Sequence, residues 1–183
     1  MSLVEITPEA HGVAIDLAYA TAGNFTGRPV YRAAHCFLHA DAAAALLRAS
    51  VLARETGHGL LVLDAYRPPE AQQKLWDHTP NPDYVAPPER GSPHSRGVAV
   101  DLTLTDAAGR PLDMGTEFDD FTPRAHHDVA ELPAAMRRNR FVLLGLMSTA
   151  GWDFYRREWW HYQLFDARRY ALVPDADAPR RMM

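Results

Sequence analysis

The sequence has very little cysteine and no long apolar run, and both facts restrict what the protein is. Cys36 is the single cysteine among 183 residues, so no disulfide can form within the chain. The first stretch, MSLVEITPEAHGVAIDL, has neither a basic segment nor a long apolar one, and such a pattern does not indicate a signal peptide. No apolar run approaches the ~20 residues of a membrane-spanning helix. We therefore expect a cytoplasmic protein with no membrane partner.

The sequence also lacks an excess of positive charge. Its formal net charge is -4, so the composition gives no reason to expect nucleic acid as a partner. Apolar residues make up 47% of the chain and charged residues 23%, which is typical of a globular protein. We expect one domain over residues 1–183 and no obligate protein partner. After about residue 166 the sequence turns polar and contains prolines, and there we expect a loosely held tail.

Apolar periodicity and turn residues predict a mixture of helices and strands. The helices are expected at 41–55, from 68 onward and at 132–151, and the strands at 59–64, 97–104 and 161–165. Asp41 can cap the first helix, and proline is tolerated in the first turn of the second. Because these elements do not alternate regularly as strand, helix and strand, we expect an α+β fold. The prediction is a single small domain with a central antiparallel sheet flanked by helices.

The segment from His78 to Pro93 carries five prolines and is predicted to be a long irregular loop. Loops of this length in compact domains are usually either functional or disordered. The sequence leaves both possibilities open.

A carboxylate stands inside the apolar run of the strand at 97–104. Asp101 follows His94 by seven positions, and an unpaired buried charge is costly. A divalent cation would supply the countercharge. Zinc in hydrolytic sites takes three protein ligands and keeps a fourth position open for water, and His94, Asp101 and His161 supply such a set. We therefore predict one Zn²⁺ per chain.

Two further residues fit hydrolytic chemistry around such an ion. Glu158 precedes His161 by three positions and is expected in the turn leading into the last strand. From there it could act as general base toward a metal-activated water. Arg67 follows the strand at 59–64, and a strand end is a rigid mount for a cation aimed at a developing oxyanion. Asp64 can hold this arginine by a charge-assisted hydrogen bond.

Each of these signals is weak alone. Histidines in strands are more often core or surface residues than ligands, and an arginine such as Arg67, taken alone, is most often part of a structural ion pair. His126 and His127 lie in a polar loop, and we leave them out of the site. His35 and His39 would share one face of a predicted strand while Cys36 points away, so we do not expect a second metal cluster there.

In combination the motifs are specific. HSRGVAVDLTL, EWWHY and DAYRP resemble the defining motifs of the VanX-type zinc D-alanyl-D-alanine dipeptidases, a family linked to glycopeptide resistance. The resemblance includes YATAGNFTGRPV, MGTEFDDF and RAHH and runs in one order from about Tyr19 to Phe165. It implies zinc-dependent hydrolysis of D-Ala-D-Ala or a related dipeptide, and a small α+β domain with a central antiparallel sheet.

The resemblance also implies roles for individual residues. These are His94, Asp101 and His161 as zinc ligands, Glu158 as catalytic base, Arg67 as the arginine that stabilises the tetrahedral intermediate, and Asp119, Tyr19 and Ser92 as substrate contacts. For Asp119 the contact is the substrate ammonium, and the alternative is a solvated loop carboxylate.

One departure from the family pattern concerns the residue before the first ligand. SPHSRG stands here where a VanX-type sequence reads SSHSRG, and Pro93 has neither a hydroxyl nor a backbone N–H. If that donor served the substrate carboxylate, affinity would fall or specificity would shift.

Two other functions stay open at this point. One is a D,D-carboxypeptidase or endopeptidase acting on peptidoglycan peptides, which would need an open groove. The other is a catalytically silent zinc-binding domain. The presence of both Glu158 and Arg67 argues against a silent domain, because such a domain has no need of a base.

Overall fold

The computed structural model describes residues 3–183. Its strands are β1 (Leu3–Glu5), β2 (Ala14–Ile15), β3 (Phe37–His39), β4 (Gly59–Asp64), β5 (Ala99–Thr105), β6 (Trp152–Phe154) and β7 (His161–Leu164). Its α-helices are α1 (Pro8–His11), α2 (Ala40–Glu55), α3 (Pro69–His78) and α4 (Ala134–Thr149). None of these helices is long and apolar enough to cross a membrane.

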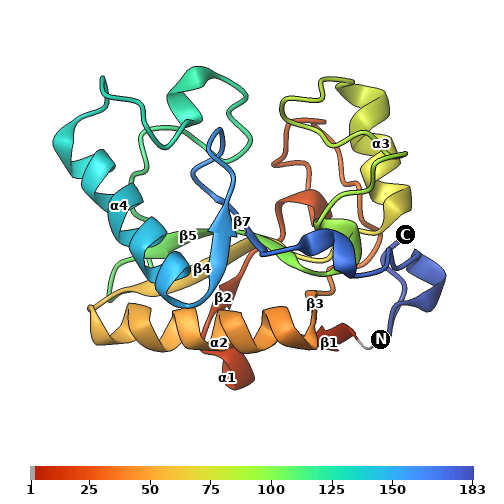
Figure 1. The fold of residues 1–183 in the computed structure, drawn as a ribbon, viewed down its shortest axis with the longest axis horizontal. Helices are drawn as coiled ribbons and strands as arrows, with labels where there is room; N and C mark the ends of the chain where they lie inside the picture. Colours follow the sequence, from red (N-terminus) through yellow and green to blue (C-terminus); the bar gives the residue numbers. More distant parts are fainter. Residues whose placement is uncertain (1–2) are drawn as a thin grey trace.

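The strands form one central sheet and one small one (Figure 1). The central sheet has the order β2-β4-β5-β7-β6. β2 pairs with β4 in parallel, and the other neighbours are antiparallel. β1 and β3 form a separate antiparallel pair. The predicted α+β domain with a mostly antiparallel sheet is confirmed, and the parallel edge pair is an addition to it.

The lower face of the sheet in Figure 1 is covered by α2. On β5, Val100, Leu102 and Leu104 are fully buried and belong to the same apolar cluster as the alanines of α2. Small side chains let the helix lie close to the strands. The larger Leu47 and Val51 of α2 are 42% and 39% exposed, so the alanines, together with Leu46 and Ser50, supply the buried surface of this helix.

The start of α2 differs from the prediction. The helix begins at Ala40, and the ring Nδ1 of His39 accepts a hydrogen bond from the backbone N–H of Asp41 at 3.2 Å. His39 therefore caps the helix, in place of Asp41. The reason is that β3 continues into the helix without a connecting loop, so the last strand residue occupies the capping position.

The segment after Asp166, where we expected a loosely held tail, packs against the rest of the protein. The backbone N–H of Val173 donates to the carbonyl of Ser95 at 2.9 Å, and the Tyr66 hydroxyl donates to the carbonyl of Val173 at 2.8 Å. Met182 is 1% exposed. The difference arises because a few apolar side chains and backbone hydrogen bonds hold this segment, and its polar composition does not reveal them.

Candidate active site

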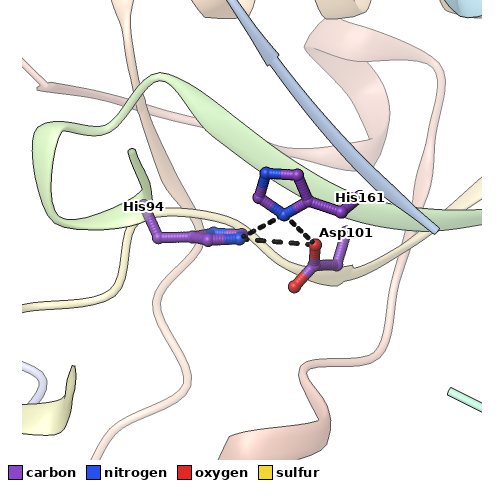
Figure 2. A group of neighbouring side chains, drawn as sticks. All are labelled: His94, Asp101 and His161. Carbon is purple, nitrogen blue, oxygen red and sulfur yellow. Dashed lines mark hydrogen bonds and ion pairs between the residues drawn. The ribbon is translucent and has the colours of Figure 1, made fainter. Parts of the chain in front are cut away.

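Two strands and a short helical turn bring three potential metal ligands together. In the antiparallel β5–β7 pair Asp101 lies directly opposite His161, so their side chains share one face of the sheet. His94 lies in a single 3-10 turn, His94–Arg96, just before β5. Figure 2 shows the three side chains pointing toward one another. Among the described residues they form the one cluster of side chains suited to holding a metal ion.

The turn that carries His94 depends on a glycine. Gly97 has a φ of +67°, and a Cβ at this position would lie 2.4 Å from the Leu3 side chain and 3.1 Å from the backbone nitrogen of His39. A larger residue would therefore push the turn away from β3. On the other side Pro93 has a φ of -56°, which its ring favours. The proline that departs from the family pattern is thus compatible with the placement of His94.

The distances within the cluster are short. Nδ1 of His161 lies 3.0 Å from Oδ1 of Asp101, and Nε2 of His94 lies 3.3 Å from the same oxygen. The two ring nitrogens are 3.1 Å apart. Tetrahedral zinc with bonds of about 2.0–2.2 Å holds its ligand atoms roughly 3.3–3.6 Å apart. The observed distances are slightly shorter, so the three ligand atoms would have to move apart only a little to hold a four-coordinate ion.

The outer nitrogen of each ring faces a hydrogen-bond acceptor. Nδ1 of His94 lies 2.7 Å from the carbonyl oxygen of Ala65, and Nε2 of His161 lies 3.2 Å from Oε1 of Gln163. Because a carbonyl only accepts, each outer nitrogen carries the hydrogen and each inner nitrogen carries a lone pair. Two lone pairs and a carboxylate oxygen then face one another without a donor. A divalent cation satisfies all three, so the residues fit a metal.

Asp101 is held in its charged form by its surroundings. Burial alone would raise the pKa of this carboxyl group, but the two imidazoles, when protonated, outweigh that effect and hold the pKa below its usual range; a divalent cation would supply the same countercharge to neutral rings. An ionised carboxylate is the form that binds a metal. The side chain is 3% exposed, so solvent screens this charge only weakly.

Glu158 lies beside the three potential metal ligands without belonging to their cluster. It sits in the turn between β6 and β7, three residues before the first residue of β7, as the sequence predicts. Its Oε2 lies 4.0 Å from Nδ1 of His161. Burial raises the pKa of Glu158 to about 8, although the nearby His161 and Arg67 partly oppose this. A carboxyl group with such a pKa can both accept and return a proton near neutral pH.

Arg67 is fixed by several hydrogen bonds at the end of β4. Its Nε and Nη2 lie 2.9 and 2.8 Å from Oδ2 of Asp64, so the predicted bond to this carboxylate is present. Nη1 donates to Oε1 of Gln72 at 3.0 Å, and Nη2 lies 3.4 Å from Oδ2 of Asp101. A register shift in the β4–β5 pair places Asp64 opposite Asp101. The guanidinium therefore lies next to the three potential metal ligands.

The three predicted substrate contacts line the same cavity of about 220 Å³ as the ligands, Glu158 and Arg67. Tyr19 donates its hydroxyl to Oδ2 of Asp119 at 3.0 Å, and the Arg67 guanidinium lies 4.8 Å from the centre of the Tyr19 ring. Burial, followed by the charge of Asp101, raises the pKa of Asp119 well above its usual value. A ligand cation beside Asp119 would offset this cost. Ser92 accepts a hydrogen bond from the backbone N–H of His94 at 3.2 Å.

Sequence reasoning missed the residues that support the site. Gln72 lies on α3 and holds Arg67, and Gln163 faces His161 from two positions further along β7. Residues two apart in a strand share a face, so the position of Gln163 could have been found. Tyr31, which donates to Oδ1 of Asp64 at 2.7 Å, comes from a segment without regular structure and left no signal.

The histidines that we left out lie outside the metal cluster. His127 is buried, with its ring centre 5.1 Å from that of Phe154 and 6.3 Å from that of Tyr162. His35 packs against Phe37, and His39 caps α2. Among the described residues none of them joins His94, Asp101 and His161.

Comparison with known proteins agrees with this site. The sequence profile of a peptidase family described as D-ala-D-ala dipeptidase matches residues 1–177. The chain belongs to this D-Ala-D-Ala dipeptidase family. It is 42% identical to the D-alanyl-D-alanine dipeptidase of Escherichia coli K12 over 173 residues, which cover 94% of this chain and 90% of the relative. Its identity to the enzyme of the same name from Enterococcus faecium is 37% over 177 residues, 85% and 88% of the two chains.

A third relative extends the range of organisms. The D-alanyl-D-alanine dipeptidase of Streptomyces coelicolor is 38% identical over 174 residues, which cover 84% of this chain and 86% of the relative. As a member of the D-Ala-D-Ala dipeptidase family the protein is a metallopeptidase. Two imidazoles and one carboxylate are ligands that hydrolytic metal sites use, and here they line a cavity.

Proposed function

We propose that the protein hydrolyses D-Ala-D-Ala or a closely related dipeptide with the help of one zinc ion. The observation that carries this proposal is the geometry of His94, Asp101 and His161. Their three inner atoms lie within 3.0–3.3 Å of one another, and in the tautomers that the carbonyls of Ala65 and Gln163 favour all three are acceptors. Family membership and the names of the relatives support the choice of substrate.

The zinc ion, when bound by these residues, would lower the pKa of water to about 7 and polarise the scissile carbonyl. Glu158 then acts as the general base that accepts the proton of the attacking water. Burial raises the pKa of Glu158, and a cation held by the three neighbouring residues would lower it again, so the carboxylate can accept a proton and then return it to the departing amine.

Arg67 stabilises negative charge on the carbonyl oxygen as the tetrahedral species forms. The ion pair with Asp64 and the hydrogen bond to Gln72 fix the guanidinium before substrate arrives. Donors that are fixed in advance need no reorganisation during the reaction, and this is where their catalytic effect originates. The structural ion pair and the catalytic role of Arg67 are therefore compatible.

Asp119 binds the substrate ammonium, with Tyr19 orienting its carboxylate, and Ser92 contributes to the wall beside His94. Burial makes an ionised Asp119 costly, and an ammonium group beside it would relieve the cost. The cavity of about 220 Å³ is smaller than the roughly 300–1,000 Å³ of sites for drug-sized ligands. A cavity of this size suits a dipeptide better than a longer peptide, for which an endopeptidase needs an open groove.

A dipeptide panel tests this function. Zinc-loaded protein is incubated with D-Ala-D-Ala, L-Ala-D-Ala and L-Ala-L-Ala, and with a longer peptide ending in D-Ala-D-Ala. We expect rapid release of alanine from D-Ala-D-Ala, slower cleavage of the others, loss of activity with a chelator and recovery with zinc. Preferential trimming of the longer peptide would instead identify a carboxypeptidase. Zinc binding without any hydrolysis would identify a silent domain.

A further inference from the structure

The cavity of the active site has a roof formed by two segments that are far apart in the sequence. The first is the proline-rich loop of residues 79–93, and the second is the turn of residues 155–160 between β6 and β7. Both supply residues to the cavity wall, among them Tyr84 and Val85 from the loop and Tyr155 from the turn. In Figure 1 the loop after α3 and the β6–β7 turn both stand above the sheet, on the side opposite α2.

A small group of contacts joins these two segments. The hydroxyl of Tyr155 donates to the backbone carbonyl of Asp83 at 3.0 Å. The guanidinium of Arg157 forms an ion pair with the carboxylate of the same Asp83. Asp83 and Tyr155 both line the cavity, so the contacts lie at its edge. We refer to Asp83, Tyr155 and Arg157 as the latch.

Hydrogen bonds connect each side of the latch to one of the proposed catalytic residues. On the loop side, Gln72 donates its Nε2 to the carbonyl of Ala86 at 2.9 Å and accepts from Arg67 through its Oε1. On the turn side, the backbone N–H of Glu158 donates to the carbonyl of Tyr155 at 3.2 Å. The closed latch therefore connects the segment that holds the arginine to the segment that carries the base.

We propose that the latch is a specificity-determining contact: when closed it confines the substrate to dipeptide length, and it must open for substrate to enter. This inference rests on the proposed dipeptidase function. The loop and the turn meet at the edge of the cavity, so a third residue that extends from the cavity past this edge would have to pass between them. A longer peptide would therefore bind only with the latch open.

The latch is suited to frequent opening because it is exposed. The Arg157 and Asp83 side chains are 42% and 58% exposed, and exposed ion pairs contribute little to stability. Breaking either contact of the latch should change the balance between closed and open forms by about 5-fold. Such a balance lets substrate enter while still disfavouring longer peptides.

The test compares kcat/KM for D-Ala-D-Ala and for tri-D-alanine in zinc-loaded variants. Tyr155→Phe keeps the ring beside His161 and removes the hydroxyl, and Arg157→Ala removes the ion pair. We expect the ratio of tripeptide to dipeptide kcat/KM to rise about 5-fold in each and more in the double variant. The charge swap of Asp83→Arg with Arg157→Asp should return the ratio toward the wild-type value.

Arg156→Ala is the matched control. Arg156 forms an exposed ion pair with Asp128, comes from the same turn, and is absent from the cavity wall. Its removal should leave the ratio unchanged. Limited proteolysis of the loop at 79–93 gives a readout that does not depend on activity. Cleavage should be about 5-fold faster in Arg157→Ala than in wild type, and unchanged in Arg156→Ala.

The outcomes separate this inference from the proposed function. If the wild-type protein does not cleave D-Ala-D-Ala, the proposed function itself is wrong. If it does, and both latch variants keep the wild-type ratio, the latch does not set substrate length. If a latch variant loses activity toward both peptides, proteolysis decides, and an unchanged cleavage rate of the loop overturns the inference.

Discussion

The two faces of β5 are buried to the same degree but have opposite chemistry. Val100 and Leu102 are fully buried in the apolar core against α2, while Asp101 and Thr103 on the other face are 2% and 5% exposed. Burial of apolar side chains stabilises the fold, whereas burial of a carboxylate opposes folding unless a partner offsets it. Because side chains alternate along β5, one face of the strand contributes to the stability of the fold and the other face carries the polar residues of the candidate site.

Glu158→Gln, in the turn beside the polar face of the sheet, should give the largest effect, and this effect is on turnover. The amide keeps the size of the side chain but cannot accept the proton of the attacking water, so turnover of D-Ala-D-Ala should fall by about 10²–10⁴-fold. Metal content, measured by elemental analysis, should stay at one ion per chain. The exposed Glu117→Gln is the control. Near-normal turnover in Glu158→Gln would show that another group is the base.

Substitutions on the apolar side of β5 should change the stability of the protein but not its affinity for metal. Leu102→Ala leaves a cavity in the core and should lower the free energy of unfolding by about 2–5 kcal/mol, measured by urea denaturation. The volume-conserving Leu102→Met should cost less than about 1.5 kcal/mol. The metal affinity of the folded fraction should be unchanged in both. A loss of affinity in proportion to the loss of stability would mean that the two faces are coupled.

The buried His127, which lies outside the candidate metal site, should make the stability of the protein depend on pH. Burial, followed by the charge of Arg140, lowers its pKa to about 4, against about 6.5 in the unfolded chain. The unfolded state therefore takes up a proton first as the pH falls. The stability contribution of neutral His127 is complete above about pH 6.5 and declines toward pH 4, by about 3 kcal/mol in total.

The measurement is the difference in unfolding free energy between pH 7.5 and 4.5 for wild type and for His127→Phe. We expect the difference to be smaller in the variant, because phenylalanine does not titrate. An identical pH dependence in both proteins would show that the histidine does not carry this effect.

The smallest effect concerns the hydrogen bond behind His161. Gln163→Leu removes the acceptor that orients the ring, and zinc affinity should fall by about 10–100-fold, as measured by competition with a chelator. Gln163→Glu keeps an acceptor and should retain most of the affinity. Equal affinity in the leucine variant would show that the strand alone fixes the ring.

The sequence predicted the central elements and the cluster of His94, Asp101 and His161 because the strands and the charged residue within one of them leave local signals. The apolar run of β4 and the alternation of β5 are read directly, and a charged residue in the middle of such a strand stands out. Asp101 was identified in this way, and the β5–β7 register then placed it opposite His161.

Other features depend on contacts between distant segments and could not be predicted. The parallel β2–β4 pair involves only two residues of β2, Ala14 and Ile15, which are too few for a periodicity. The packing of the C-terminal segment rests on contacts such as that between Val173 and Ser95. The roof of the cavity joins the loop at 79–93 to the β6–β7 turn, and the sequence of neither segment predicts that it contacts the other.

The amide of Gln72 links the position of the loop to the rigidity of Arg67. One end of this buried side chain contacts Arg67 and the other contacts the carbonyl of Ala86. A displacement of the loop that breaks the second contact would leave the amide held by Arg67 alone, so this anchor of the guanidinium would be less rigid while the entrance is wide. The ion pair with Asp64 does not involve the loop, so the arginine would stay in place and regain its second firm anchor once the loop returns.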